Sequence, residues 1–406
     1  MNKTIVLDSI MGSGKTTWAI NYMNNHQDKN FIYVTPFLEE VQRVKTTVNR
    51  TVWEPTQQNE SGSKLASFKS IIQIHNTICT THALFRMLDN ECIELLKQRE
   101  FTLILDEVLE VVEELPYTKG DVEFLMSSKY ISVGETGLLQ WIDEQNENLS
   151  FGIKLFQDFE RMIKCNQIIK INDSLLWQFP PEIFKVFKDI YVLTYNFEAS
   201  MLYYYFKTNK IDFIKKGVNK GEICDFVNID KSKYRKLINI YSGNLNHNIP
   251  NTNSYSFSKR YYERNHQLIN KIKNNIYNYF FNVMKSPSSN NMWTSFKSWQ
   301  NQLTGKGYAR GFVPCTARAT NKFRNKSVLV FPINIYMHPL IIQYFNKYGY
   351  TVNQDEYALN VLLQWIWRSA IREEKSVYIY LLSSRMRILL YQWLNYTESE
   401  IESMEL

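Results

Sequence analysis

Short runs of consecutive apolar residues alternate with longer stretches of helical periodicity along most of the chain. The clearest runs are TIVLD at residues 4–8, FIYVT at 31–35 and TLILD at 102–106. Continuous rather than alternating hydrophobicity is typical of strands that are covered on both faces. The pattern therefore predicts an α/β fold with largely parallel sheets. Further strands are expected at 72–81, 190–194, 237–241, 328–331 and 377–382.

The predicted strands fall into two sets, separated by a break at residues 215–235. A chain of 406 residues has room for two or three domains of ordinary size. We therefore expect two lobes, at residues 1–215 and 230–406.

The first lobe also contains an unusually long connection. The 88 residues from Asp106 to Thr194 are more than one helix and its loops need. Segments such as IKLFQDFERMIKC at 153–165 have helical periodicity. We expect an inserted helical subdomain at about 115–188, with support of the lobe as its default role.

The composition excludes several classes of protein. With 44% hydrophobic residues, 14 Gly and 10 Pro, the chain is neither collagen-like nor disordered. Its five cysteines lack C-x-x-C spacing, so we expect neither a zinc site nor a disulfide framework. No signal-peptide pattern is present, and no apolar run approaches the ~20 residues of a membrane helix. We expect a cytoplasmic protein with no membrane partner, in the host cytoplasm if a phage encodes it.

The segment MGSGKTT at residues 11–17 connects the first predicted strand to a helical stretch. In this context glycines let backbone N–H groups surround phosphates, Lys15 reaches the β- and γ-phosphates, and the Thr16 hydroxyl can bind Mg²⁺. A plain strand-to-helix turn is the alternative, but the Lys and Thr in register favour a nucleoside triphosphate. The expected nucleotide-binding residues are Gly12, Ser13, Gly14, Lys15, Thr16 and Thr17.

An acidic pair, Asp106 and Glu107, ends the predicted strand at 102–106. We expect Asp106 to hold Mg²⁺ together with Thr16, and Glu107 to act as general base toward the attacking water. Transfer of phosphate to a small acceptor would not need the second carboxylate. Hydrolysis is therefore favoured over kinase chemistry.

A helical pattern at residues 355–372 contains Gln364, Arg368 and Arg372 at four-residue spacing. On one continuous helix these three side chains would share a face. That face is either a solvated polar surface or a source of arginines for the γ-phosphate of the nucleotide. The phosphate loop elsewhere in the chain favours the second interpretation.

Charge is distributed unevenly along the chain, whose net charge is +7. Residues 231–330 hold 17 Lys and Arg against one acid, Glu263, a local charge of +16, and the rest sums to −9. Such a block attracts polyanions, and its aromatic residues offer rings for base stacking. The alternative is a solvated basic face over buried aromatics. The aromatic residues concerned are Tyr255, Tyr261, Tyr262, Tyr277, Trp293 and Trp299.

These motifs, in this order, resemble those of superfamily-two helicases, above all phage-encoded helicases of the DEAD/DEAH-like group. They are also similar to the helicase part of herpesvirus-type replication origin-binding proteins. MGSGKTT is similar to motif I, DEVL at 106–109 to motif II and QWIWRSAIR at 364–372 to motif VI, with Trp367 where Gly is usual. The resemblance implies two RecA-like lobes, ATP and Mg²⁺ as cofactors, nucleotide at the interface of the lobes, and Arg368 or Arg372 as arginine finger.

The resemblance extends to segments that would contact nucleic acid. YVTPFLEE at 33–40 is similar to motif Ia, CTTHAL at 79–84 to the next backbone-contact motif, and residues 312–331 to motif V. LTYNFEA at 193–199 stands where motif III couples hydrolysis to movement, and MWTSF at 292–296 is similar to motif IV. With the basic block, the expected nucleic-acid-binding residues are Thr35, Pro36, Thr81, His82, Arg310, Arg318, Thr320, Asn321 and Arg324.

The sequence thus predicts an ATP-dependent nucleic-acid translocase or helicase of phage or mobile-element DNA replication. Its expected partner is single-stranded or tailed duplex nucleic acid, with DNA favoured over RNA, together with replication proteins. One alternative is an origin-binding or loading factor that uses ATP as a conformational switch. Another is a packaging-type motor ATPase, against which the basic second half argues.

Overall fold

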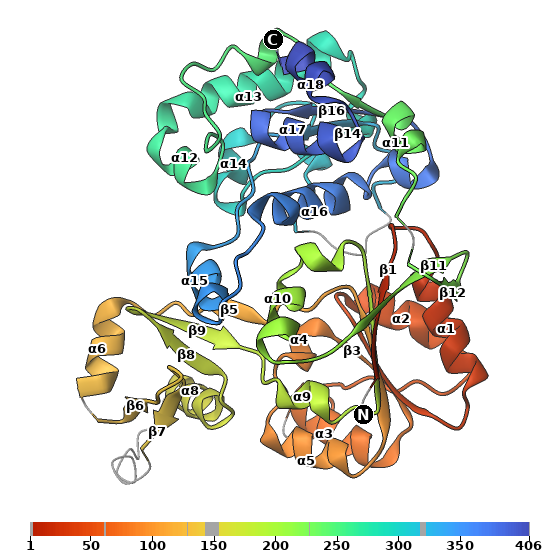
Figure 1. The fold of residues 1–406 in the computed structure, drawn as a ribbon, viewed down its shortest axis with the longest axis vertical. Coiled ribbons are helices and arrows are strands. Elements are labelled where there is room, and N and C mark those ends of the chain that lie inside the picture. The colour runs from red at the N-terminus through yellow and green to blue at the C-terminus, as the bar shows by residue number, and fades with distance from the viewer. Residues whose placement is uncertain are drawn as a thin grey trace. The chain divides into compact units, whose positions relative to one another are not determined.

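The computed structural model describes residues 3–60, 62–127, 129–142, 154–226, 228–316 and 322–405 (Figure 1). The chain divides into two compact units. The first comprises Met1–Val227 and His338–Val352, and the second Asn228–Met337 and Asn353–Leu406. The segment His338–Val352, which the predicted boundaries place in the second lobe, thus groups with the first unit.

The first unit is built on a sheet of strand order β12-β11-β1-β10-β4-β2-β3. Its pairs are parallel except for the antiparallel hairpin of β11 and β12. The central strands are buried along nearly their whole length, which explains their continuous apolar runs. The strands are β1 (Lys3–Asp8), β2 (Asn30–Thr35), β3 (Thr77–Thr81), β4 (Phe101–Asp106), β10 (Asp189–Thr194), β11 (Ile214–Asn219) and β12 (Glu222–Cys224).

Helices pack on this sheet and build its core. Trp18 and Met23 of α1 and Val41 of α2 join Leu7 and Phe31 of the sheet in one hydrophobic cluster. The helical elements are α1 (Lys15–Asn25), α2 (Leu38–Thr47), α3 (Lys64–Ile74), α4 (His82–Phe85), α5 (Asn90–Lys97), α9 (Glu182–Lys185), η1 (Phe197–Ala199) and α10 (Met201–Thr208).

The insertion after β4 is a mixed subdomain with its own small core, which includes Val122, Ile131, Phe159 and Ile168. The prediction of a mainly helical insertion was therefore wrong. The physical reason is a hairpin whose turn places Asn172 at φ 53°, a left-handed conformation that Asn tolerates. Its elements are β5 (Val112–Glu114), α6 (Lys119–Ser127), β6 (Ile131–Val133), β7 (Leu139–Trp141), α8 (Lys154–Lys164), β8 (Ile168–Ile171) and β9 (Ser174–Gln178).

Helix α15 (Pro339–Lys347) joins the first unit through polar and aromatic contacts. The buried Tyr344 hydroxyl donates to Gln178 Oε1 at 2.9 Å, and Phe345 packs against Tyr204 with ring centroids 5.5 Å apart. A segment distant in sequence therefore completes the surface between the insertion and α10.

The second unit has a parallel sheet of order β13-β16-β15-β14. Its strands are β13 (Ile238–Ile240), β14 (Asn291–Trp293), β15 (Val328–Phe331) and β16 (Val377–Leu381). Its helical elements are α11 (Ser232–Leu237), η2 (Asn244–Asn246), α12 (Lys259–Arg264), η3 (His266–Leu268), α13 (Ile269–Asn278), the π-helical turn η4 (Tyr279–Val283), η5 (Ser288–Asn290), η6 (Lys297–Trp299), α14 (Gln300–Leu303), η7 (Ala309–Gly311), α16 (Gln354–Ile366), η8 (Ala370–Glu373), α17 (Ser384–Trp393) and α18 (Glu398–Glu405). No helix within the described ranges combines the length and apolar character required to cross a membrane.

Helix α16 is shorter than its sequence pattern predicts. It ends at Ile366, so the expected continuous helix through Arg372 was wrong. Trp367 is buried against Tyr234 and Trp393, and the Ala370 N–H donates to Lys326 O at 2.8 Å. These tertiary contacts turn the chain away from the helix axis. Gln364 therefore lies on α16, whereas Arg368 and Arg372 follow it and share no helical face with it.

Candidate nucleotide-binding site

The loop between β1 and α1 has the backbone conformation that its glycines permit. Gly12 and Gly14 have φ of 91° and 94°, a left-handed region that side chains with a Cβ rarely adopt. Gly14 is the N-cap of α1, and its carbonyl accepts from the Trp18 N–H at 2.8 Å. The loop thus leads directly into a helix N-terminus, where unpaired N–H groups and the helix dipole favour a phosphate.

The Lys15 ammonium lies close to the first residues of this loop. It donates to the carbonyls of Ser9 and, at 3.0 Å, Ile10. The positive charge is therefore held at the carboxyl end of β1, beside the loop that would hold phosphates.

Thr16 and Asp106, 90 residues apart in sequence, are adjacent in the structure. The Thr16 hydroxyl donates to Asp106 Oδ2 at 3.4 Å, and the Tyr33 hydroxyl donates to the same oxygen at 2.7 Å. Burial, followed by the nearby charge of Glu107, raises the pKa of Asp106 to about 6. A hydroxyl and a carboxylate side by side form the oxygen-only donor set that Mg²⁺ prefers, so these residues fit the ion.

Glu107 is fixed in position through its backbone. Its φ is 69°, and its N–H donates to Leu193 O of β10 at 2.9 Å. The buried His82 ring contacts the Asp106 carbonyl at 3.0 Å. The turn after β4 is thereby fixed from two sides, and the Glu107 side chain remains partly exposed.

Asp8 is a candidate functional residue that the sequence reasoning missed. It ends β1 and is 5% exposed, and its carboxylate accepts from the N–H groups of Asn196 at 2.7 Å and Phe197 at 2.9 Å. Burial raises its pKa, against the lowering effect of these bonds and of Lys215. Asp8 therefore connects the strand before the phosphate loop to the segment at 193–199. Its signal was an acid that ends an apolar run, the same pattern that identified Asp106.

The β11–β12 hairpin packs against the phosphate loop (Figure 1). The Val218 N–H donates to Ser9 Oγ at 2.7 Å, and the Gly221 N–H to Ser13 O at 3.4 Å. A Cβ atom on Gly14 would lie 2.6 Å from the Gly221 nitrogen. The Ser9 side chain, at the position where such loops usually have Gly, thus anchors the hairpin.

Replacing Gly14 by alanine is expected to destabilise the protein more than replacing Gly349, because only Gly14 is packed against a backbone. Both residues have a positive φ, near 94° and 82°, and share a strain cost of ~1–2 kcal/mol. A Cβ on Gly349 meets nothing within 4 Å, whereas at Gly14 the hairpin must move, at a further ~1–3 kcal/mol. Urea unfolding of the two variants measures the difference, and equal losses would show that the hairpin does not pack on the loop as described.

The predicted nucleic-acid residues of the first unit lie together at the carboxyl ends of β2 and β3. Thr35 pairs with Thr81 in the strand register, Pro36 follows Thr35, and His82 begins α4. Thr35 and His82 are buried, and the Thr81 hydroxyl accepts from the Leu84 N–H at 3.4 Å. Their contact with nucleic acid stays a prediction.

The predicted residues of the second unit have mixed surroundings. Arg310 is exposed in η7, and Arg324 pairs with Glu373 at 3.3 Å. Arg318, Thr320 and Asn321 lie outside the described residues.

The three candidates from the predicted motif VI also differ in exposure. Arg368 is 3% exposed, Arg372 is partly buried, and Gln364 Nε2 donates to Asn360 Oδ1 at 3.2 Å. Their roles toward the nucleotide, including that of the arginine finger, stay predictions.

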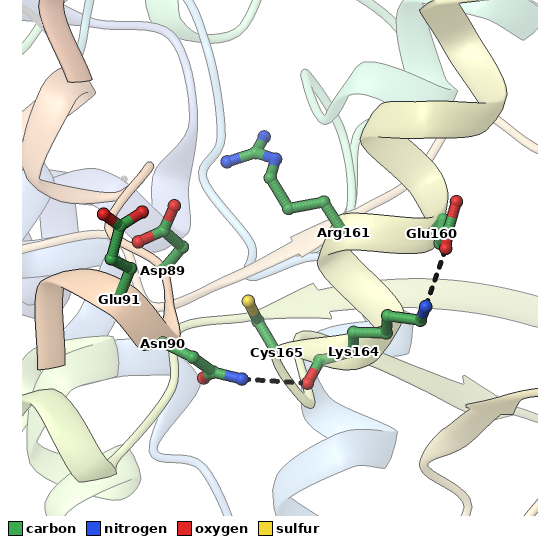
Figure 2. A pocket seen from close by; sticks show the side chains of 7 residues that line it. All are labelled: Asp89, Asn90, Glu91, Glu160, Arg161, Lys164 and Cys165. Carbon is green, nitrogen blue, oxygen red and sulfur yellow. Dashed lines mark hydrogen bonds and ion pairs between the residues drawn. The ribbon is translucent and has the colours of Figure 1, made fainter. Parts of the chain in front are cut away.

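A pocket of about 330 Å³ lies where the insertion meets the main part of the first unit, and Figure 2 shows the side chains that line it. Its lining comes from α5 and α8 with their flanking residues, and Asn90 Nδ2 donates to Lys164 O at 3.1 Å across it. No group of three or more His, Cys, Asp or Glu in the described part of the chain is placed to hold a metal ion. The lining residues are Asp89, Asn90, Glu91, Glu160, Arg161, Lys164 and Cys165.

Solved structures share this fold over nearly the whole length of the chain. The apo structure of an XPD protein matches with a TM-score of 0.53 and 12% identity, over 97% of this chain and 95% of that one. The Xpd4 structure of S. tokodaii matches with a TM-score of 0.51 and 12% identity, over 98% and 95%. At this identity the match concerns the fold alone. Fold and loop together define an α/β P-loop protein with two RecA-like lobes.

Sequence comparison places the chain more narrowly. It is 41% identical over 409 residues to the SPbeta prophage-derived uncharacterized protein YonV of Bacillus subtilis (strain 168), covering 97% of this chain and 99% of that protein. Residues 232–394 match the model of the YonV C-terminal Rossmann-like domain. The chain belongs to the YonV family. The similarity to herpesvirus-type origin-binding proteins stays a prediction.

Proposed function

We propose that this protein is a nucleic-acid-stimulated ATPase of superfamily two that moves along single-stranded nucleic acid and separates duplexes. The observation that carries the proposal is the Thr16–Asp106 contact of 3.4 Å beside Lys15, with Glu107 next in the chain. A phosphate loop alone would support triphosphate binding. The second carboxylate, placed on a fixed turn at the same sheet edge, adds the means to activate water.

In this proposal the loop N–H groups and Lys15 bind the β- and γ-phosphates of ATP. Thr16 and Asp106 hold Mg²⁺, which when bound neutralises charge on the phosphate oxygens. Glu107 accepts a proton from the attacking water at its carboxylate oxygen. Tyr33 keeps the Asp106 carboxylate oriented through its 2.7 Å hydrogen bond.

Asp8 is the proposed link between hydrolysis and movement. Its carboxylate accepts hydrogen bonds from two successive N–H groups of the segment that resembles motif III. Asp8 is also the last residue of β1, the strand that leads into the phosphate loop. If the phosphate loop moves when the γ-phosphate is lost, the hydrogen-bonded carboxylate of Asp8 would therefore transmit that movement to residues 196–197.

The nucleic-acid partner is proposed from charge and from the origin of the relative. The block at 231–330 carries +16, which favours a phosphate backbone, and the 41% identical relative is prophage-derived. The fold shared with the XPD structures supplies the two lobes that the resemblance to superfamily-two helicases implies. We propose single-stranded and tailed DNA as substrate, in phage or mobile-element DNA replication.

A strand-displacement assay on duplexes with a 5′ or a 3′ single-stranded tail tests the function. We expect ATP-dependent release of one strand from one tail polarity, and none from a blunt duplex. DNA-stimulated hydrolysis without release from either tail would overturn the unwinding proposal and favour a loading factor that uses ATP as a switch. A parallel set of RNA duplexes tests the choice of DNA.

A further inference from the structure

The aromatic residues of the basic block differ widely in exposure. Tyr262, Trp293 and Trp299 are at most 6% exposed and belong to the core of the second unit. Tyr255 and Tyr277 are 69% and 42% exposed. Of these five residues Tyr255 is the most exposed, and it is the one best able to offer a ring face to a base.

Tyr255 is the most exposed member of a cluster in which Tyr336 contacts both other side chains, Tyr255 and Arg385. Its ring lies on that of Tyr336, with centroids 5.8 Å apart and planes 24° from parallel. The Arg385 guanidinium lies 4.2 Å from the Tyr336 ring centroid. Tyr336 is therefore supported by Arg385 and in turn supports Tyr255.

The base of this cluster is fixed by hydrogen bonds. The Arg385 guanidinium pairs with Asp355 at 2.7 Å and donates to Asn334 Oδ1 at 2.8 Å and to the carbonyls of Ile335 and Gln354. Because Asp355 neutralises its charge, Arg385 serves the cluster rather than a phosphate.

The loop that bears Tyr255 is fixed to the same support. The Tyr336 hydroxyl donates to Ser254 O at 2.8 Å, and Asn334 Nδ2 donates to the carbonyls of Ser254 and Ser256 on either side of Tyr255. The exposed ring thus needs little further ordering to bind a partner.

The cluster stands at the edge of the sheet where ligands bind in α/β folds. Tyr336 follows the carboxyl end of β15, and Arg385 lies in the first turn of α17, after the carboxyl end of β16. Lys259 and Arg260, both exposed, come four and five residues after Tyr255. An ordered, exposed ring with two exposed basic residues four and five positions on in sequence suits a stacked base with its phosphate, and suits an apolar protein surface less well.

We propose that Tyr255 is a stacking platform for an unpaired base of single-stranded nucleic acid, a site that rests on the proposed function and specifies how the second lobe holds the strand. The Tyr336 and Arg385 side chains are positioning residues beneath it. Because stacking involves the base and not the phosphate, its contribution is independent of salt.

The test compares wild-type protein with Tyr255→Ala, Tyr255→Trp and the matched control Tyr378→Ala, an exposed tyrosine at the amino end of β16 and outside the basic block. The probes are fluorescein-labelled oligothymidylate and an abasic phosphodiester of equal length. Tyr255→Ala should bind oligothymidylate about tenfold more weakly, within the roughly 5- to 150-fold range for one lost stacked base. Tyr255→Trp and Tyr378→Ala should bind it as wild type does, and the abasic probe should bind all four proteins equally, with equal salt slopes.

The outcomes separate this proposal from the function on which it rests. Equal oligothymidylate affinity of Tyr255→Ala and wild type would overturn the platform and leave the ATPase proposal standing. An equal loss on the abasic probe would also overturn it, since the contact would then be to the backbone. Failure of wild-type protein to bind either probe would overturn the proposed function itself. ATP affinity without nucleic acid should be unchanged in Tyr255→Ala.

Discussion

Replacement of Glu107 by glutamine should lower ATP turnover by about 10²–10⁴-fold, the contribution of a positioned general base. Glutamine has nearly the same shape, so the turn fixed by the N–H bond to Leu193 O should persist. It cannot accept the proton of the attacking water at neutral pH. ATP affinity should therefore remain close to that of wild type, and the bound triphosphate should accumulate. Phosphate release with and without oligonucleotide, beside ATP-induced thermal stabilisation, measures both effects.

The matched control for this variant is Glu110→Gln, the same chemical change at an exposed residue three positions on. It should leave turnover and thermal stabilisation unchanged. Turnover within a fewfold of wild type in Glu107→Gln would remove the assigned base, and the proposal would then need a proton acceptor other than this carboxylate. A loss of ATP affinity instead would make Glu107 a binding residue.

The sequence predicts the α/β fold because burial on both faces leaves a direct record in the residues. Strands such as β4 and β10 are buried at almost every position, and each has a run of consecutive apolar residues. Strand β11 has no such record. Its sequence IKKGVN is partly exposed, and it joins the sheet through backbone hydrogen bonds to β1. A strand held mainly by its backbone cannot be recognised from apolar periodicity.

The candidate site shows the same division between local and distant information. The positions of Gly12, Gly14 and Lys15 can be predicted from local sequence, because a strand, a turn and a helix that follow one another suffice to place them. Tyr33 reaches Asp106 only because β2 and β4 are neighbours, and strand order is absent from a single sequence. The same holds for Asp8, whose partners lie in the segment that follows β10, the strand paired with β1.

The shortened helix α16 shows how tertiary contacts override local periodicity. Residues 355–372 keep a helical pattern throughout, yet the backbone leaves the helix after Ile366. Burial of Trp367 against two aromatic rings and the Ala370–Lys326 hydrogen bond replace the helical contacts. The spacing argument for Arg368 and Arg372 therefore does not apply, although the residues themselves remain candidates through the resemblance.

The largest effect on ATP binding is expected from Lys15→Ala. The ammonium stands at the beginning of the loop, on the Ser9 and Ile10 carbonyls, where it is the basic side chain of the phosphate motif. Its removal deletes a charge directed at the β- and γ-phosphates in the bound and transition states, and loss of one such group costs at least about 10²-fold in turnover. At 100 times the wild-type Kd, ATP stabilises a protein by about 2.7 kcal/mol. That stabilisation should disappear in the variant, while the unfolding free energy without ATP changes little.

Lys97→Ala is the matched control, because it also removes one positive charge. Lys97 is an exposed residue of α5, and the ion pair described for it is with Glu94, one helical turn away. It should retain ATP-induced stabilisation, turnover and strand displacement in full. If Lys15→Ala kept its ATP-induced stabilisation, the triphosphate would have to be bound elsewhere. The proposed role of the loop, and with it the placement of Mg²⁺ at Thr16 and Asp106, would then be wrong. If ATP-induced stabilisation is instead lost in Lys15→Ala and kept in Lys97→Ala, ATP binds at the loop whose conformation Gly14 and the β11–β12 hairpin maintain.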